Sequence, residues 1–423
     1  MNVLKIVKSS PAFVFPAVIN LISLVAFTRL LSLENYGRLS LALVSIEFLQ
    51  GILYMWVNMC VMRFNQPEDK FSSIGVGLHF NASITAVLLA AGLGLVGYQL
   101  VFGGVDLIYF EAILLGVISR GVGNFVQDCH RIYYPDLKPY TKVTVLANAC
   151  YYLPAVLLLL LRRQTGINEL LLVQVSGLLL FEAVLLLRHY RVVLAQLRRA
   201  RGWPIYQEFL KYGLPLVVSF VSLSMFVRID RFIVQHNVGA LALGTYSAAF
   251  SLSNLTISSF FTILTLPTYP EIMKKFNGGD SEGAMAIYRK NGKIILLVSG
   301  PLLLFSCFFS AQLCHLFFGV DKGNKVAVLF PWVILSTFMF NYRGHYSDQI
   351  YQFYKKTKIS MLVSMGTGLA HLGAGYLLSR AWGAQGVSIS GICLNTIAIA
   401  FTLYYRHYRL REQQALPLAL QST

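Results

Sequence analysis

Apolar stretches long enough to cross a bilayer recur along the whole chain, separated by short polar segments. A helix of about 20 apolar residues spans the hydrocarbon core of a membrane. The pattern predicts twelve spans, at residues 11–31, 38–61, 76–101, 107–126, 141–161, 169–188, 211–234, 243–265, 292–315, 326–346, 359–379 and 385–405. An even number of spans puts both ends of the chain on one side. We therefore expect an all-α, polytopic membrane protein.

Lysine and arginine are distributed unequally between the two sets of connecting segments. The set that includes the N-terminus holds 25 of the 35 basic residues, and the opposite set holds seven. The remaining three, Arg120, Arg228 and Arg231, fall inside predicted spans. Because cytoplasmic loops of membrane proteins are enriched in Lys and Arg, this bias predicts that both termini lie in the cytoplasm.

The composition agrees with a membrane protein and excludes several other classes. Hydrophobic residues make up 56% of the chain and charged residues 13%, with a mean hydropathy of +0.62. Soluble domains carry about a quarter charged residues. The net charge of +17 invites a nucleic-acid interpretation, but no polar segment is long enough to form such a domain. No G-x-S-x-G, H-E-x-x-H, Walker or C-x-x-C motif is present, so we expect neither an enzyme nor a cofactor or metal site.

A basic segment divides the chain near its middle. It reads R-H-Y-R-V-V-L-A-Q-L-R-R-A-R-G-W-P from Arg188 onward and predicts an amphipathic helix held at anionic lipid headgroups. Gly37 and Ser40 recur as Gly244 and Ser247, and Pro215 is placed in the first turn of span seven, as Pro11 is in span one. We predict parallel repeats around a central cavity: a six-helix lobe at 1–190, a cytoplasmic linker at 191–210, a second six-helix lobe at 211–406 and a cytoplasmic tail at 407–423.

Several predicted spans carry polar residues spaced to lie on one helix face. These faces comprise Glu47, Tyr54 and Asn58; Arg120, Asn124, Gln127 and Arg131; Ser224, Arg228, Arg231 and Gln235; and Asn341, His345, Asp348 and Gln352. Lipid cannot solvate such faces, so we expect them to point into the bundle or a water-filled cavity. A second interpretation is that the uncharged members join helices, at about 0.6 kcal/mol per hydrogen bond.

The three arginines inside spans indicate an anionic ligand. An arginine at the centre of a membrane helix costs about 3 kcal/mol to insert, which packing alone does not require. The planar guanidinium binds phosphate oxygens bidentately. Arg120, Arg228 and Arg231, with Asn124 and Gln127 beside the first, are therefore the predicted binding residues.

The acidic residues and one histidine in the spans allow two interpretations. Glu47, Glu111, Asp230, Asp348 and also Glu182 are either ion-pair partners of buried arginines or sites that bind H⁺ or Na⁺. For Asp230 the expected partner is an arginine on a neighbouring helix. His371, which follows Ser364 and Thr367 in span eleven, is either a proton relay or a hydrogen-bonded packing residue.

Three motifs resemble one family of transporters. They are T-R-L-L-S-L-E-N-Y-G-R-L-S-L-A at Thr28, R-I-D-R-F-I-V…L-G-T-Y-S-A-A-F-S-L at Arg228 and W-G-A-Q-G-V-S-I-S-G at Trp382. In this order they are similar to polysaccharide exporters of the multidrug/oligosaccharidyl-lipid/polysaccharide (MOP) superfamily, and most to the Wzx-type O-antigen flippases.

This resemblance implies a V-shaped bundle of two lobes in the bacterial inner membrane, with a cationic cavity that opens alternately to either side. The implied cargo is an oligosaccharide on undecaprenyl diphosphate, used for O-antigen lipopolysaccharide or a related polysaccharide, and the implied partners are the polymerase and chain-length regulator of that pathway. Arginines of the cavity would bind the diphosphate, here by role Arg120, Arg228 and Arg231, with Arg29 and Arg38 at the periplasmic mouth.

Two other members of the same superfamily are alternatives. A cation-coupled drug antiporter needs an acidic cavity, which three arginines disfavour, and a lipid II-type flippase usually has two further spans. A membrane scaffold without transport activity would not need charged faces on several helices.

Overall fold

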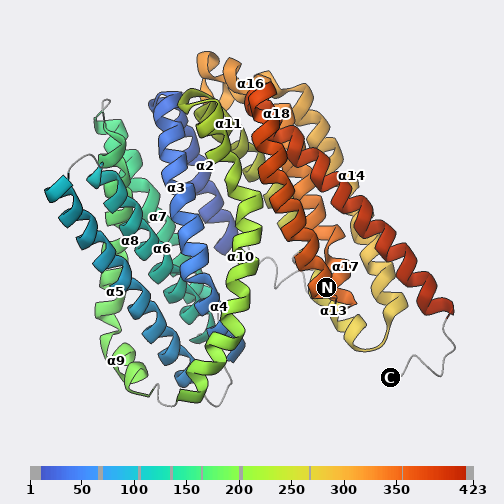
Figure 1. The fold of residues 1–423 in the computed structure, drawn as a ribbon, viewed down its shortest axis with the longest axis horizontal. Coiled ribbons are helices and arrows are strands. Elements are labelled where there is room, and N and C mark those ends of the chain that lie inside the picture. Colours follow the sequence, from blue (N-terminus) through green and yellow to red (C-terminus); the bar gives the residue numbers. More distant parts are fainter. Residues whose placement is uncertain are drawn as a thin grey trace. The chain divides into compact units, whose positions relative to one another are not determined.

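The described part of the chain is helical nearly throughout and contains no strand (Figure 1). The computed structural model describes residues 11–64, 70–102, 106–133, 137–162, 165–199, 203–265, 268–354 and 356–415. The helices of the first half are α2 (Pro11–Leu30), α3 (Leu33–Leu53), α4 (Met55–Phe64), α5 (Lys70–Phe102), α6 (Leu107–Tyr133), α7 (Leu137–Leu161), α8 (Ile167–Arg188) and α9 (Tyr190–Arg199).

The second half follows α10 (Trp203–Asn237) and includes two π-helical turns, η1 and η2. Its elements are α11 (Ala240–Ser253), η1 (Asn254–Ser258), α12 (Ser259–Thr265), α13 (Thr268–Asn277), α14 (Ser281–Phe308), α15 (Ser310–Phe318), α16 (Val320–Tyr342), η2 (Arg343–Ser347), α17 (Gln349–Phe353) and α18 (Thr357–Ala415). Each π turn holds one more residue than an α turn, so it rotates the side chains that follow it.

The chain forms two compact units that meet within α10. The first unit comprises residues 2–224 and the second residues 225–423. The predicted lobe, linker and tail boundaries stay predictions. α9, at the predicted amphipathic segment, packs against α5 within the first unit (Figure 1).

Nine helical stretches of the described residues are long and apolar enough to cross a membrane, and Phe15–Leu30 is a shorter apolar helix. One of the nine, Lys358–Tyr408, covers the last two predicted spans. It bends at Trp382 and at Gly383, whose φ of 58° is accessible to glycine without strain. Helices occupy all twelve predicted positions, whereas the count of twelve spans and the side of the termini stay predictions.

Several predicted span boundaries differ from the helix ends; α14, for example, begins at Ser281 rather than at 292. Span two was expected as one helix, but it is interrupted at Tyr54, between α3 and α4. α10 begins at Trp203 rather than at 211, because Pro204 takes the N-terminal position that suits proline. Pro215 therefore lies inside α10 and not in its first turn.

Close helix packing and an aromatic cluster hold the first unit together. Trp56, Phe125 and Phe209 belong to a buried cluster that joins α4, α5, α6 and the N-terminal part of α10. α7 and α8 approach so closely that a Cβ on Gly177 would lie 2.2 Å from the carbonyl oxygen of Cys150. This packing fixes α6, α7 and α8, the helices that surround Arg120.

Candidate substrate- and ion-binding residues

Arg120 lies midway along α6 in an aromatic environment supplied by α7. Its guanidinium carbon is 4.1 Å from the centroid of the Tyr151 ring, and Nη2 donates a hydrogen bond of 3.4 Å to the Tyr152 hydroxyl. Its Nε has no hydrogen-bond partner among the described residues. A guanidinium with donors still available at this depth is suited to an anionic ligand.

Two carboxyl groups share this region. Glu47 of α3 and Glu182 of α8 both interact electrostatically with Arg120. Glu182 is only 3% exposed, and neither of its oxygens has a hydrogen-bond partner among the described residues. It fits against Gly123, where a Cβ would lie 2.2 Å from Oε1. Gly123 follows Arg120 by one helical turn, so the carboxyl and the guanidinium lie on neighbouring parts of one face of α6.

The rest of the predicted α6 face is used unevenly. Gln127 accepts a hydrogen bond of 3.2 Å from Thr144 of α7, and Asn124 is half-buried. Arg131, at the end of the helix, is exposed. The polar face predicted for span two is not continuous, because the helix is interrupted at Tyr54, between α3 and α4. The Tyr54 hydroxyl lies 2.9 Å from the Thr85 hydroxyl of α5.

The remaining predicted residues of the first unit lie near the ends of its helices. Glu111, in the second turn of α6, is half-buried against Gly92 of α5. Arg29 is exposed at the end of α2. Arg38 is also exposed and forms an ion pair of 2.8 Å with Glu34, one turn earlier in α3. The structure thus gives Arg38 a partner on its own helix.

Asp230 joins three helical segments of the second unit. It accepts a short hydrogen bond from the Tyr246 hydroxyl of α11, and its Oδ1 lies 2.5 Å from Nε2 of His371 in α18. The other ring nitrogen of His371 is 3.0 Å from the Ser390 hydroxyl, beyond the bend of α18. An arginine was expected as the ion-pair partner of Asp230. Among the ion pairs of the described residues, its partner is His371 instead.

The neighbouring arginines of α10 make other contacts. Arg231 is 6% exposed, and its guanidinium carbon lies 4.3 Å from the centroid of the Phe250 ring. Arg228 and Gln235 are half-buried, while the side chain of Ser224, the fourth member of the predicted face, lies outside the described residues.

A small cavity of about 40 Å³ adjoins Asp230, Tyr246, Asn254 and Asn341. This volume accommodates water or a small cation beside the carboxylate. The second unit therefore places a buried carboxylate, an imidazole and a polar cavity together.

Arg343 is a buried residue that the sequence placed at the cytoplasmic end of the tenth span, among the basic residues on the side of the N-terminus. It is 5% exposed and forms an ion pair of 3.0 Å with Asp348. Its Nη1 and Nη2 donate to the hydroxyls of Thr367 and Ser364, at 2.8 and 3.1 Å. Asp348, predicted as an ion-pair or coupling residue, is thus an ion-pair partner. The π turn η2 begins at Arg343 and changes the direction of the side chains from there on. The predicted face assumed a regular 3.6-residue periodicity and therefore did not include this arginine.

Removing this arginine will destabilise the second unit. Arg343→Ala leaves the half-buried Asp348 without its partner, which costs up to about 3 kcal/mol. We expect a clearly lower thermal unfolding midpoint for the purified protein in detergent. Arg289→Ala removes an exposed arginine of α14 and should leave the midpoint near that of the unaltered protein. Equal midpoints for the two variants would contradict a stabilising role of this ion pair.

The arrangement of helices is that of MOP-superfamily transporters. It is similar to the inward-facing conformation of a multidrug resistance MATE family transporter, with a TM-score of 0.73, 13% identity and coverage of 97% of this chain and 100% of that one. It is also similar to the lipid II flippase MurJ in an inward closed conformation, with a TM-score of 0.70, 13% identity and coverage of 94% and 87%. A MOP superfamily transporter from Pyrococcus furiosus is similar with a TM-score of 0.59 and 13% identity, over 98% of this chain and 99% of that one.

Sequence comparison then identifies the family. A family model described as "polysaccharide biosynthesis protein" matches residues 26–326, well over half of the chain. The chain belongs to this family, which confirms the predicted resemblance to MOP-superfamily polysaccharide biosynthesis exporters. No curated protein matches the sequence. The structural relatives are transporters and a flippase, in agreement with the prediction that the chain is not an enzyme.

Proposed function

We propose that the protein is a flippase of the bacterial inner membrane that moves an undecaprenyl-diphosphate-linked oligosaccharide from the cytoplasmic to the periplasmic leaflet. Membership of the polysaccharide biosynthesis family and the MOP transporter fold support this class of function. The observation that carries the proposal is Arg120, a guanidinium held on tyrosines in the middle of a membrane-length helix. The product would feed the assembly of O-antigen, capsule or exopolysaccharide, with the polymerase of that pathway as a partner.

The cargo diphosphate would bind Arg120 first. The guanidinium stacks on Tyr151 and keeps an N–H available, so it can donate to a phosphate oxygen without first leaving a carboxylate ion pair. Arg228 and Arg231 would supply further cations from the second unit during alternating access. Asn124 and Gln127 are the candidates for sugar hydroxyls, since carboxamides both donate and accept hydrogen bonds.

The driving ion would bind buried acids of the two units. Asp230 and His371 form one such place, beside a cavity that accommodates water or a cation. Glu182 is another, because a carboxyl without a hydrogen-bond donor is costly to keep ionised in a membrane interior. The ion, H⁺ or Na⁺, is identified by which imposed gradient accelerates transport.

Complementation tests the class of cargo. A strain that lacks its O-antigen flippase receives this chain together with the glycosyltransferases of the matching polysaccharide pathway, and surface glycan is measured. We expect restored glycan in that strain and no rescue of cells depleted of their lipid II flippase. Rescue of the second strain alone would identify a lipid II flippase, and resistance to organic cations without glycan would identify a drug antiporter.

A further inference from the structure

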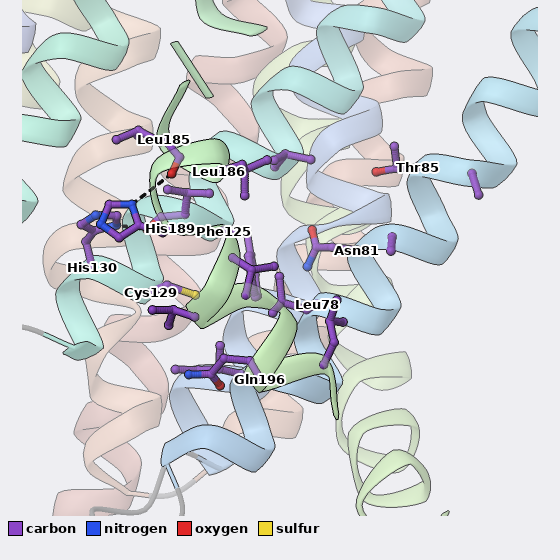
Figure 2. A pocket seen from close by; sticks show the side chains of 18 of the residues that line it. Leu78, Asn81, Thr85, Phe125, Cys129, His130, Leu185, Leu186, His189 and Gln196 are labelled. Carbon is purple, nitrogen blue, oxygen red and sulfur yellow. Dashed lines mark hydrogen bonds between the residues drawn. The ribbon is translucent and has the colours of Figure 1, made fainter. Parts of the chain in front are cut away.

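The first unit contains an apolar cavity that the proposed cargo site does not use. It has a volume of about 510 Å³ and lies between α5, α6, α8 and α9 (Figure 2). Its wall is almost entirely hydrocarbon, from side chains such as Leu78, Phe125, Leu186 and Val193, and no acidic residue lines it. A hydrophobic chain is the chemical class of ligand that this wall accepts.

The cavity starts at the predicted cytoplasmic interface, opens toward lipid and is longer than one leaflet of the hydrocarbon core. Its α5 side runs from Ile74 to Leu89, about 22 Å at 1.5 Å per residue. With the predicted orientation, Ile74 lies near the cytoplasmic interface, and half of the hydrocarbon core is about 15 Å thick. Ala82, Ala86 and Leu89 line the cavity and are exposed, so it opens sideways toward lipid. An acyl chain of the cytoplasmic leaflet can therefore enter along α5.

Arginines flank the cytoplasmic end of the cavity without lining it. α9 turns Val192, Val193 and Leu197 toward the cavity, whereas its Arg191 and Arg198 are exposed. Arg188, exposed at the end of α8, adds a third cation. Basic side chains at this level of the membrane attract anionic headgroups, and each contributes about 1 kcal/mol to lipid binding in general.

Two side chains in the cavity wall have a carboxamide oxygen that accepts no hydrogen bond from the described residues. Asn81 is 5% exposed and Gln196 is 3% exposed, yet the carboxamide oxygen of each has no partner among the described residues. Figure 2 shows Asn81 pointing from α5 toward Phe125 and Leu186, across the cavity. Buried carboxamide oxygens are normally hydrogen-bonded, so both positions indicate a ligand that brings hydroxyl groups or water.

We propose that this cavity binds an anionic glycerophospholipid with a polyol headgroup, such as phosphatidylglycerol, from the cytoplasmic leaflet. One acyl chain fills the apolar part, and the headgroup hydroxyls with their bound water donate to Gln196 and Asn81. Arg188, Arg191 and Arg198 attract the anionic headgroup to the membrane surface around the cavity. The cavity reaches about 22 Å from the cytoplasmic interface, which fits a single acyl chain, whereas the longer isoprenoid chain of the proposed cargo would extend beyond it. The site does not depend on the proposed transport activity.

Photocrosslinking in vesicles tests this lipid site. The full-length protein is reconstituted with phosphatidylglycerol or phosphatidylcholine that carries a diazirine on one acyl chain, and labelled peptides are identified by mass spectrometry. We expect phosphatidylglycerol to label the cavity-lining segments of α5, α6 and α8 in preference to phosphatidylcholine. Ala86→Trp, which fills the cavity from α5, should lose most of this labelling. Ala91→Trp places the same side chain on an exposed position outside the cavity and should retain it.

The basic end is tested separately. The double substitution R191A/R198A should lower the preference for phosphatidylglycerol over phosphatidylcholine about 30-fold. Equal labelling by both lipids in the unaltered protein, or unchanged labelling in Ala86→Trp, would overturn the proposal. Displacement of the label by a small excess of undecaprenyl phosphate would also overturn it, by identifying an isoprenoid chain as the occupant. Labelling is measured without transport, so failure of the flippase proposal would leave these outcomes unaffected.

Discussion

Arg120→Ala should abolish surface glycan in the complemented strain while the protein remains in the membrane. The substitution removes the buried donor fork that is proposed to hold the cargo diphosphate. A charge-assisted hydrogen bond contributes about 2–3 kcal/mol, so the loss lowers cargo affinity about 30- to 100-fold. Arg120→Lys should restore glycan only in part, because an ammonium keeps the charge and loses the bidentate geometry. Immunoblots of glycan and of membrane-inserted protein are the two measurements.

Arg63→Ala is the matched control for this prediction. Arg63 is an exposed arginine in the last turn of α4, within the same unit of the chain. Its loss should leave glycan near the level of the unaltered protein, because exposed charges of this kind contribute little to stability. Full glycan in both Arg120→Ala and Arg120→Lys would rule out Arg120 as a phosphate-binding residue.

Asp230→Asn should separate transport from the ion gradient. The substitution keeps the shape of the side chain but removes the charge that faces Tyr246 and His371. If a cation binds there, an imposed gradient will accelerate flipping by the unaltered protein and have no effect on this variant. Initial flipping rates in proteoliposomes, with and without gradients of H⁺ and of Na⁺, measure the effect and identify the ion.

Two further variants distinguish coupling from a structural role. Asp230→Ala leaves Tyr246 and His371 without their shared acceptor, so we expect a lower unfolding midpoint in addition to lost coupling. Asp321→Asn removes an exposed carboxylate from the first turn of α16 and should retain the gradient response. A gradient response in Asp230→Asn equal to that of the unaltered protein would exclude Asp230 as the coupling residue.

The helical positions and Arg120 were predictable because they follow from simple physical rules. Runs of apolar residues must be long enough to span a bilayer, and each span appears as helix in the described chain. Arg120 stands out because a cation in the middle of such a run is expensive. The sequence also singled out Asp230, for its charge within an apolar segment, and His371, for an imidazole that can carry a proton, although it did not pair them.

The side-chain partners were not predictable, because they depend on packing between distant helices. Asp230 and His371 are 141 positions apart, and nothing in either segment specifies their contact. The ion pair of Arg343 depends on a π turn, which regular 3.6-residue periodicity does not encode. Glu182 was a candidate from the sequence, but its place against Gly123, beside Arg120, is known only from the structure.

Flipping of a purified lipid-linked oligosaccharide in proteoliposomes tests the central claim most directly. The cargo is an undecaprenyl-diphosphate-linked repeat unit placed in one leaflet, and its access to an externally added lectin or glycosidase reports its transfer. The account predicts rapid transfer with the unaltered protein and with Arg63→Ala, and transfer at the rate of empty vesicles with Arg120→Ala. Equal transfer by Arg120→Ala and the unaltered protein would contradict the proposed role of Arg120. No transfer by the unaltered protein under any imposed gradient would contradict the proposed flippase activity.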